Sequence, residues 1–562
     1  MTKRALLAAT CIIVFLPLST LKAEPLAGSY LAARQAAFSS DFAAGAAYFD
    51  RALSADPTSP YLLESAMIAH VGLGEFEKAV PIAQAMVDLD LKSQLAHLVL
   101  SVDAASADDW TRVFALLEQD LSVGPLVDGL TQAWAFVGQG QMSRGLEQFD
   151  TVIATAGLGA YGLYSKALAL ASVGDFESAD AIFAGSPENG MRYNRRSAIA
   201  HAQILSQLDR NTDASALIDR TFGAQSDPTV SAIREKLIAG DKVEFDFIGS
   251  VKNGMSELYL MVAQALVGDA DDDYTLRYAR AAAHLNPKNS DAILLAADLL
   301  ENMRHYDLAS ATYSTVIRDD PAFQSAELGR AETLRQAGKM EAAIEVLEAL
   351  VRSTPKDPRV HATAGDTYRE AKDLAKAKAA YTKAIDLYAE ADPLKWFIYY
   401  MRGITNHGLD DWPAAEADFR AALALNPDQP QVLNYLGYSM VERGINLEEA
   451  LTMIETAVAA EPQNGAIVDS LGWILFQRGA YADAVIHLEN AASLIPVDPV
   501  INDHLGDGFW AVGRFNEAQF QWYRALSFNP TEKDAAKIRR KLEIGLDAVR
   551  AEEGQPPLAD VK

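Results

Sequence analysis

Seven prolines recur at an almost constant interval through the second half of the chain. The gaps between them are 34, 34, 72, 35, 34 and 34 residues, and 72 is two intervals of 34 with four inserted residues. The prolines are Pro287, Pro321, Pro355, Pro427, Pro462, Pro496 and Pro530. A fixed period of this size is typical of proteins built from stacked repeats, each of which buries its apolar face against its neighbours.

Other positions recur in step with the prolines. At 5, 8, 12 and 24 residues before the proline the residues are small or apolar. Before Pro496 these are Ala491, Leu488, Ala484 and Gly472; before Pro530, Ala525, Trp522, Ala518 and Gly506; before Pro427, Ala422, Phe419, Ala415 and Gly403. Small residues let two helices approach closely, the large residue fills the space between them, and proline ends the second helix. We count eight repeats between about residues 256 and 530.

Each repeat is predicted to be a pair of antiparallel helices, because apolar residues fall at helical spacing on both sides of a short polar turn. Asp411 and Pro413 mark one helix start, as a capping residue and a first-turn proline. The period and the residue pattern resemble those of the tetratricopeptide repeat (TPR). The resemblance implies an all-α superhelical solenoid that binds protein partners.

The first half of the chain carries a degenerate form of the same pattern. Ala33, Gly45, Phe49, Ala52 and Pro57 match it, and we expect five or six repeats over residues 24–222. Residues 223–254 interrupt the period, and Lys242 to Ile248 alternate as a strand or an extended segment does. We therefore predict two superhelical arms, residues 24–222 and 255–530, that are joined by a non-repeat linker at 223–254.

Residues 1–23 are expected to be a cleaved export signal, since Lys3 and Arg4 precede an apolar run from Ala5 to Leu18 and Ala23 supplies a small residue for cleavage. A membrane anchor is the alternative, but the run is short for a span of about 20 residues. Removing residues 1–23 takes three of the 49 basic residues and none of the 76 acidic residues, which leaves a formal net charge of −30 and no cysteine. This composition opposes nucleic-acid binding and suits the periplasm of a Gram-negative bacterium. We expect no transmembrane segment in the mature chain.

No catalytic pattern occurs in the sequence: there is no His-Glu-x-x-His pair, no cysteine pair and no phosphate-binding glycine loop. His487 and His504 lie on predicted repeat helices, where a structural role is expected. A calcium ion at Asp269 to Asp273 is an alternative, although carboxylate density alone does not fix ligand geometry. We therefore expect a protein without catalytic residues, cofactor or metal.

The first helix of each repeat should line the concave side of the superhelix. The residues that should face inward stand three before and one after the repeat glycine, and a tryptophan extends the strip: Tyr400, Ile404, Asn434, Tyr438, Asp469, Trp473, Asp503, Asp507 and Trp510. Aromatic residues supply contact area, whereas aspartates favour a partner with basic groups. The alternatives are packing between repeats for the aromatic residues and a solvated face for the aspartates.

Residues 531–562 should form a capping helix and a disordered tail. The helix carries the basic cluster Lys537, Arg539, Arg540 and Lys541. Either the cluster contacts an acidic partner or lipid headgroup, or the helix simply closes the apolar face of the last repeat, as the ends of solenoids require.

The segments Asn434 to Tyr438 and Asp469 to Trp473 resemble a narrower group. They are similar to exported Gram-negative TPR adaptors for carboxyl-terminal processing proteases. This resemblance implies a non-enzymatic periplasmic adaptor that presents a partner to an envelope protease. Such adaptors are often lipoproteins, and the signal here lacks a matching lipid-attachment motif, so any association with the outer membrane would be peripheral. The alternatives are an assembly factor for outer-membrane or polysaccharide-export machinery, and an enzyme with an unrecognised N-terminal site.

Overall fold

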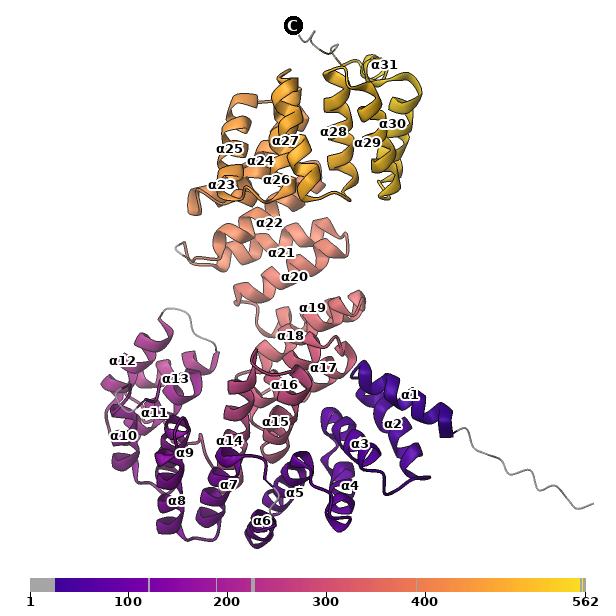
Figure 1. Cartoon of the computed structure of the whole chain (residues 1–562). Coiled ribbons are helices and arrows are strands. Elements are labelled where there is room, and N and C mark those ends of the chain that lie inside the picture. The colour runs from indigo at the N-terminus through magenta and orange to yellow at the C-terminus, as the bar shows by residue number, and fades with distance from the viewer. Residues whose placement is uncertain are drawn as a thin grey trace, which may run out of the picture. The chain divides into compact units, whose positions relative to one another are not determined.

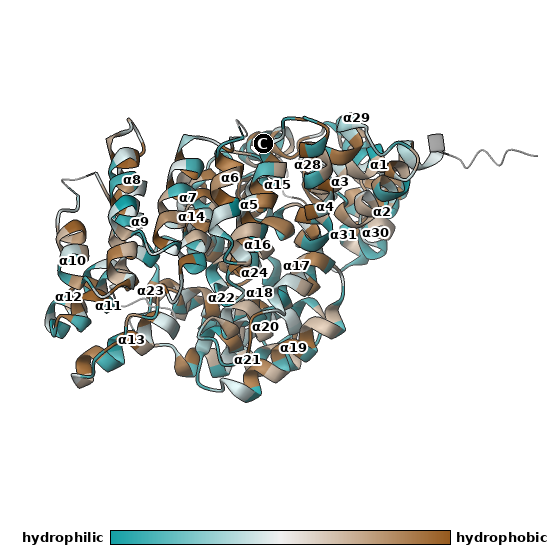
Figure 2. Cartoon of the chain, turned by 90° about the horizontal axis from the view of Figure 1, so that it is seen from below, coloured by the Kyte–Doolittle hydropathy of each residue, from teal (hydrophilic) through white to brown (hydrophobic). Residues whose placement is uncertain are grey.

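The computed structural model describes residues 26–119, 122–187, 190–223, 228–390, 392–555 and 558. The expected export signal and most of the expected C-terminal tail lie outside these residues. The described part of the chain consists of helices joined by short turns and contains no β-strand beyond a single bridge between Val267 and Ala270. Figure 2 shows that individual helices carry both apolar and polar residues. The all-α prediction is confirmed.

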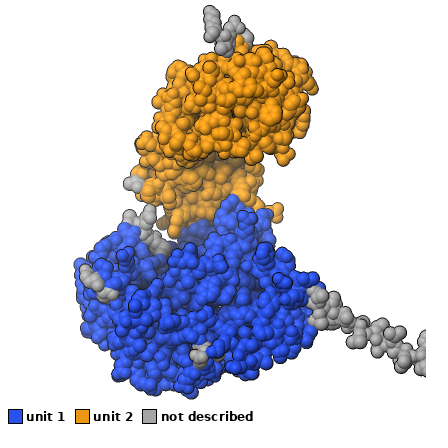
Figure 3. Space-filling view, in the orientation of Figure 1, with its two compact units in different colours: residues 1–339 blue, residues 340–562 orange. Residues whose placement is uncertain are grey.

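The contacts divide the chain into two compact units, residues 1–339 and 340–562 (Figure 3). The helices of unit 1 are α1 (Leu26–Phe38), α2 (Phe42–Leu53), α3 (Pro60–Leu73), α4 (Phe76–Asp88), α5 (Gln94–Ser106), α6 (Trp110–Leu117), α7 (Pro125–Gly138), α8 (Met142–Ala154), α9 (Gly159–Ser172), α10 (Phe176–Ala184), α11 (Arg195–Gln207), α12 (Asn211–Phe222), α13 (Pro228–Ala239), α14 (Val251–Leu266), α15 (Asp272–Leu285), α16 (Ser290–Asn302), α17 (Tyr306–Tyr313) and α18 (Phe323–Gln336). Those of unit 2 are α19 (Met340–Ser353), α20 (Pro358–Glu370), α21 (Leu374–Leu387), α22 (Lys395–Gly408), α23 (Trp412–Leu425), α24 (Pro430–Arg443), α25 (Leu447–Ala460), α26 (Gly465–Gln477), α27 (Tyr481–Leu494), α28 (Pro499–Ala511), α29 (Phe515–Ser527), α30 (Glu532–Ile544) and α31 (Leu546–Glu552).

Successive helices pack against each other in pairs, as two-helix repeats require. The helices from α14 to α29 correspond to the eight expected repeats, and those from α1 to α12 correspond to six degenerate ones, with α13 left over. We call the first helix of each pair the A helix; in unit 2 the A helices are α20, α22, α24, α26 and α28. Asp411 caps α23 by accepting from the Ala414 amide, as expected.

The repeat glycines mark the closest approach within each pair in unit 2. A Cβ atom on Gly472 would lie 2.6 Å from Leu488 Cγ, and one on Gly506 would lie 2.4 Å from Trp522 Nε1. Gly365, Gly403 and Gly437 oppose Tyr381, Phe419 and Ile454 in the same way. All five large residues are fully buried. Within each repeat, the interval between the glycine and the large residue therefore reflects their contact, because the large side chain fills the space left by the missing Cβ atom.

In unit 1 the later helices pack against the earlier repeats. Helix α15 packs on α3 and α5, and α14 packs on α7 and α9, so that α14 and α15 lie inside the arc of N-terminal helices (Figure 1). A Cβ atom on Gly254 in α14 would lie 2.5 Å from Trp134 in α7. In α15, His284 stacks on Phe76 with ring centroids 4.5 Å apart. Helices α14 and α15 thus cover the face that the A helices of the N-terminal repeats would otherwise expose.

This packing explains why the contacts do not divide the chain at residues 223–254, where we expected the join between two arms. The division falls after Lys339, and the expected linker lies within unit 1. Part of the linker is helix α13, and the alternating segment is extended but forms no strand. Its Val243 amide donates to Ser206 Oγ (2.8 Å) and its Val243 carbonyl accepts from Gln207 Nε2 (2.6 Å), which holds it on α11.

Candidate functional site

A pocket of about 350 Å³ opens on the A helices of unit 2. It is lined by His407, Asn434, Tyr435, Tyr438, Ser439, Glu442, Ala466, Asp469, Ser470, Asp498, Val500 and Ile501. These residues come from α22, α24, α26 and α28, with Asp498 at the N-cap of α28. Asn434 and Asp469 occupy equivalent repeat positions, three residues before Gly437 and Gly472. The repeat thus places successive polar side chains in one pocket.

Most polar groups of this pocket already have partners within the chain. Tyr435 Oη lies 3.1 Å from His407 Nδ1, and Tyr438 is hydrogen-bonded to Glu442. Asp498 Oδ1 accepts from the amides of the first turn of α28. Burial raises the pKa of Tyr438, and the nearby carboxylates of Glu442 and Asp469 raise it further, so this phenol stays protonated.

Two buried oxygen atoms in the pocket have no hydrogen-bond partner: Asn434 Oδ1 and Asp469 Oδ1. The other Asp469 oxygen lies 2.8 Å from His504 Nδ1, and Asp469 is only 5% exposed. Leaving a buried acceptor unpaired costs roughly 1–3 kcal/mol. The pocket therefore has an unmet capacity to accept hydrogen bonds.

Three of the predicted groove residues, Asn434, Tyr438 and Asp469, come together in this pocket. Trp473 does not line it; its ring stacks on His504 at 3.9 Å and on Phe476 at 5.0 Å. Tyr400 is half-buried and packs edge-on against Tyr435. For Trp473 and Tyr400 the alternative interpretation, packing between repeats, describes these contacts.

Asp503 and Asp507 do not form a free acidic strip. Lys541 Nζ of α30 lies 2.8 Å from Asp503 Oδ2 and from Asp507 Oδ1, and its side chain is 1% exposed. Trp522 Nε1 also donates to Asp507 (3.0 Å). Trp510 donates from Nε1 to Asp547 (2.8 Å) in α31. The sequence pattern placed these residues on the correct helix, but the C-terminal helices cover them.

The basic cluster of α30 is used within the chain, in agreement with a capping helix. Besides Lys541, the other three members form ion pairs with nearby glutamates: Lys537 with Glu553, Arg539 with Glu532, and Arg540 with Glu543 and Glu552. Because these pairs are exposed, each contributes little to stability. Their positive charge is nevertheless balanced locally.

Sequence reasoning missed Tyr435, Glu442 and Asp498 as pocket residues. Glu442 stands four residues after Tyr438, one helical turn along the same face, so its place was available from spacing. Asp498 was readable only as a helix cap before Pro499. Its contribution to the pocket depends on how neighbouring repeats stack, which the sequence does not specify.

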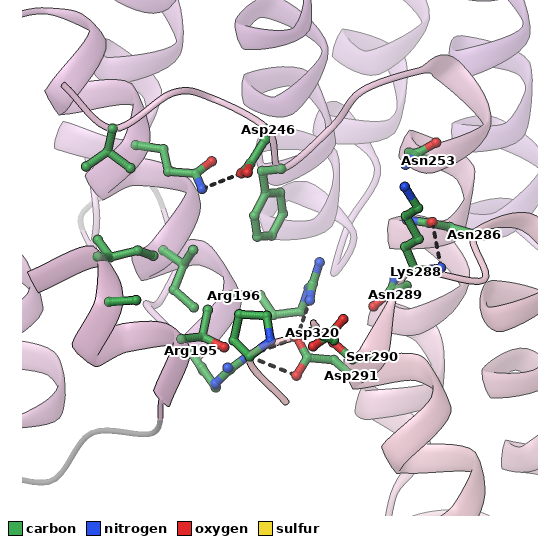
Figure 4. Close-up of a pocket in the computed structure, with 18 of the residues that line it drawn as sticks. Arg195, Arg196, Asp246, Asn253, Asn286, Lys288, Asn289, Ser290, Asp291 and Asp320 are labelled. Atoms are coloured by element: carbon green, nitrogen blue, oxygen red, sulfur yellow. Dashed lines mark hydrogen bonds and ion pairs between the residues drawn. The ribbon is translucent and has the colours of Figure 1, made fainter. Parts of the chain in front are cut away.

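A second pocket, of about 380 Å³, lies in unit 1 among α11, α13 and the starts of α14 and α16 (Figure 4). Arg196 is central to it: its guanidinium pairs with Glu257 and Asp291 and lies 4.5 Å from the centre of the Phe247 ring. Burial raises the pKa of Glu257, although Arg196 opposes this shift. This network ties α11 to α14 and α16, and cationic and acidic side chains both line the pocket.

Across the described ranges no cluster of three or more histidine, cysteine, aspartate or glutamate residues has the arrangement of a metal site. Within those same ranges no helix combines the length and the apolar character needed to cross a bilayer.

Comparison with known proteins identifies the repeat. Two profiles described as tetratricopeptide repeat match residues 294–358 and 446–499, and residues 358–390. The chain therefore contains tetratricopeptide repeats, and the corresponding sequence prediction is confirmed. The matched residues lie between α16 and the start of α28.

Similar sequences match only part of the chain. A TPR repeat-containing protein of Pseudomonas aeruginosa is 29% identical over 187 residues, which are 33% of this chain and 31% of that protein. The aspartyl/asparaginyl beta-hydroxylase of Homo sapiens is 26% identical over 211 residues, which are 35% of this chain and 27% of that protein. The chain thus spans less than a third of the length of either relative.

Similar solved structures include the APC/C hetero-tetramer Cut9-Hcn1, with a TM-score of 0.38, 14% identity, and coverage of 92% of this chain and 96% of that chain. The TPR protein YrrB, described as having an unusual peptide-binding site, has a TM-score of 0.28 and 18% identity, and covers 33% of this chain and 94% of its own.

Proposed function

We propose that this TPR protein is a non-enzymatic scaffold that binds a protein partner on the A-helix face of unit 2. The observation that carries the proposal is the difference between the two sets of A helices. In unit 1, α14 and α15 occupy the face of the N-terminal A helices. In the described part of unit 2, extensive helix contacts join helices within two positions along the chain, and a pocket remains on α22, α24 and α26. The C-terminal helices approach α26, where Arg550 of α31 lies 6.0 Å from the centre of the Phe476 ring.

The partner is proposed to present basic groups. The pocket on this face is lined by three acids, Glu442, Asp469 and Asp498, and His407 is the one basic residue among the described residues that line it. Burial, together with nearby Arg443, lowers the pKa of His407, which keeps its imidazole neutral near pH 7. The pocket therefore has a negative charge that complements lysine or arginine.

The experiment is affinity capture of partners by the full chain, followed by measurement of the affinity for the recovered partner. Replacing Tyr438 with alanine should weaken that affinity by ~2 kcal/mol or more, as loss of an aromatic hot spot does. Tyr523→Ala is the matched control, because Tyr523 is an exposed tyrosine on the outer helix α29. Equal binding by folded Tyr438→Ala and wild type would contradict the proposed face.

We extend the proposal to location and pathway on sequence grounds. The apolar segment 1–23 supports export to the periplasm, and the residues around Asn434 and Asp469 support a role in presenting a partner to an envelope protease. A phosphatase fused after about residue 60 should be active, with the mature N-terminus near Glu24. Retention of the full-length chain in the cytoplasm would contradict export. An assembly factor should instead capture components of the outer-membrane or export machinery, and an enzyme should turn over substrate alone.

A further inference from the structure

The two unpaired buried atoms of the unit 2 pocket are of one chemical kind. Asn434 Oδ1 and Asp469 Oδ1 are both acceptors, and both belong to residues that line the same 350 Å³ space. Buried polar groups in folded proteins almost always find partners. A ligand that pairs with these two atoms must bring hydrogen-bond donors.

The negative charge of the pocket further restricts the class of ligand that it can bind. Asp469 is buried, and Glu442 and Asp498 line the same space. Two cations close to the lining have partners of their own: Arg443 stacks over Trp412 at 4.7 Å, and protonated His504 would pair with the other oxygen of Asp469. The charge of Arg369 also reaches Tyr435, but Arg369 does not line the pocket. A positively charged donor is stabilised by these carboxylates as well as by its hydrogen bonds, whereas a neutral amide is stabilised by its hydrogen bonds alone.

The remaining lining suits an aliphatic stem. The rings of Tyr435 and Tyr438 and the side chains of Ala466, Val500 and Ile501 line the pocket beside the acceptors. Lysine buries its methylene chain along such surfaces while its ammonium reaches a polar site, and tyrosine faces attract cations.

We propose that this pocket is a socket for one lysine side chain of the partner, with its ammonium donating to Asn434 Oδ1 and Asp469 Oδ1. An ammonium has three donors, so two meet the unpaired oxygens and one remains for water or Glu442. A guanidinium has five donors in a rigid fork and would leave several unpaired here. The inference rests on the proposed function, because it names the group that the A-helix face would bind.

The test uses the full chain and a labelled, otherwise uncharged ten-residue peptide with one central lysine, and measures the Kd by fluorescence anisotropy. Three companion peptides carry arginine, norleucine or Nε-acetyl-lysine at that position. Norleucine keeps the stem without the charge, and acetylation removes the charge and two donors. We expect both neutral peptides to bind at least roughly tenfold more weakly than the lysine peptide, with arginine intermediate.

Two variants assign the effect to the socket. Asp469→Asn removes the charge at nearly constant shape, and Asn434→Leu removes the second acceptor; each should abolish the preference for lysine over norleucine. The matched control is Asp483→Asn, which removes an exposed acid on α27 and should leave the preference unchanged. If Asp469→Asn perturbs the fold, Asn434→Leu alone decides the result.

The inference is overturned if lysine and norleucine peptides bind equally, if arginine binds more tightly than lysine, or if folded Asn434→Leu retains the lysine preference. A failure of the proposed function would give a different result. Asn434→Leu would then abolish the preference for the lysine peptide but leave the affinity for the captured partner unchanged.

Discussion

The contact between Gly472 and Leu488 allows a quantitative test of the repeat register, through the substitution Gly472→Leu. The first added carbon would lie 2.6 Å from Leu488 Cγ, 2.7 Å from its Cδ2 and 3.1 Å from its backbone nitrogen. Leu488 is fully buried, so it has no open space into which to move. Overpacking of this kind costs ~1–3 kcal/mol.

Helix propensity acts in the opposite direction, since leucine favours a helix over glycine by ~0.8 kcal/mol. Because the added side chain has three further carbons beyond the Cβ atom, we expect the upper part of the overpacking range and a net destabilisation of ~2 kcal/mol. That difference lowers the folding equilibrium constant of the affected region by roughly thirtyfold.

Urea unfolding followed by tryptophan fluorescence is the suitable assay, because five of the seven tryptophans lie in unit 2. The transition of unit 2 should move to lower urea in Gly472→Leu. A second substitution, Leu488→Ala, should recover part of the loss when combined with it, although Leu488→Ala alone is destabilising by ~2–5 kcal/mol. An unchanged urea midpoint for Gly472→Leu, or additive effects of the two substitutions, would refute the reasoning.

Three further predictions concern other contacts. Replacing Lys541 with methionine should destabilise the C-terminal cap by ~3 kcal/mol, because it leaves Asp507 buried without its counter-charge; no change in amide exchange of α30 would contradict this. Raising the pH from about 5 to 8 should lower the unfolding free energy of the same region. Burial lowers the pKa of His504 but its carboxylate neighbours raise it above its usual value, so its stabilising contribution is complete below about pH 6.5 and is lost as pH rises through the raised value. Burial also raises the pKa of Asp507 to about 6, although Lys541 opposes the shift, so ionisation of this carboxyl between about pH 4 and 6 adds to the loss; a pH-independent stability would refute both. Gly254→Leu should destabilise unit 1 by ~2 kcal/mol through its clash with Trp134, and an unchanged thermal transition of unit 1 would show that α14 does not pack there.

The features that depend on residues close in sequence were predictable. The interval between glycine and the large residue gave the register of each helix pair, because a missing Cβ atom on one helix must be matched by bulk on the next. Asp411 and Pro413 likewise marked the start of α23, since capping is a local interaction. Asn434 and Asp469 occupy equivalent positions in successive repeats, so the repeat pattern predicted that they lie on one face. Both residues line the same pocket.

The features that depend on distant parts of the chain were not predictable from the repeat pattern. Lys541 reaches Asp507 across 34 residues and also pairs with Asp503, so that Asp507 is buried and Asp503 is half-buried instead of forming an open strip. Nothing in the local sequence around Asp503 or Asp507 indicates that a lysine covers them. The packing of α14 and α15 on the N-terminal helices is another such case, because each helix alone has the pattern of an ordinary repeat helix.

The position of α14 and α15 affects the order in which the chain can complete its fold during synthesis. In a simple repeat array each new repeat can dock as soon as it emerges from the ribosome. Here the face formed by α3, α5 and α7 stays uncovered until residues 251–285 have been made, well over a hundred residues after α7. During that interval the nascent chain exposes apolar groups such as Trp134, which is fully buried in the finished protein. A growing chain of this design exposes apolar surface for longer than a strictly nearest-neighbour array of the same length, and such exposure favours aggregation.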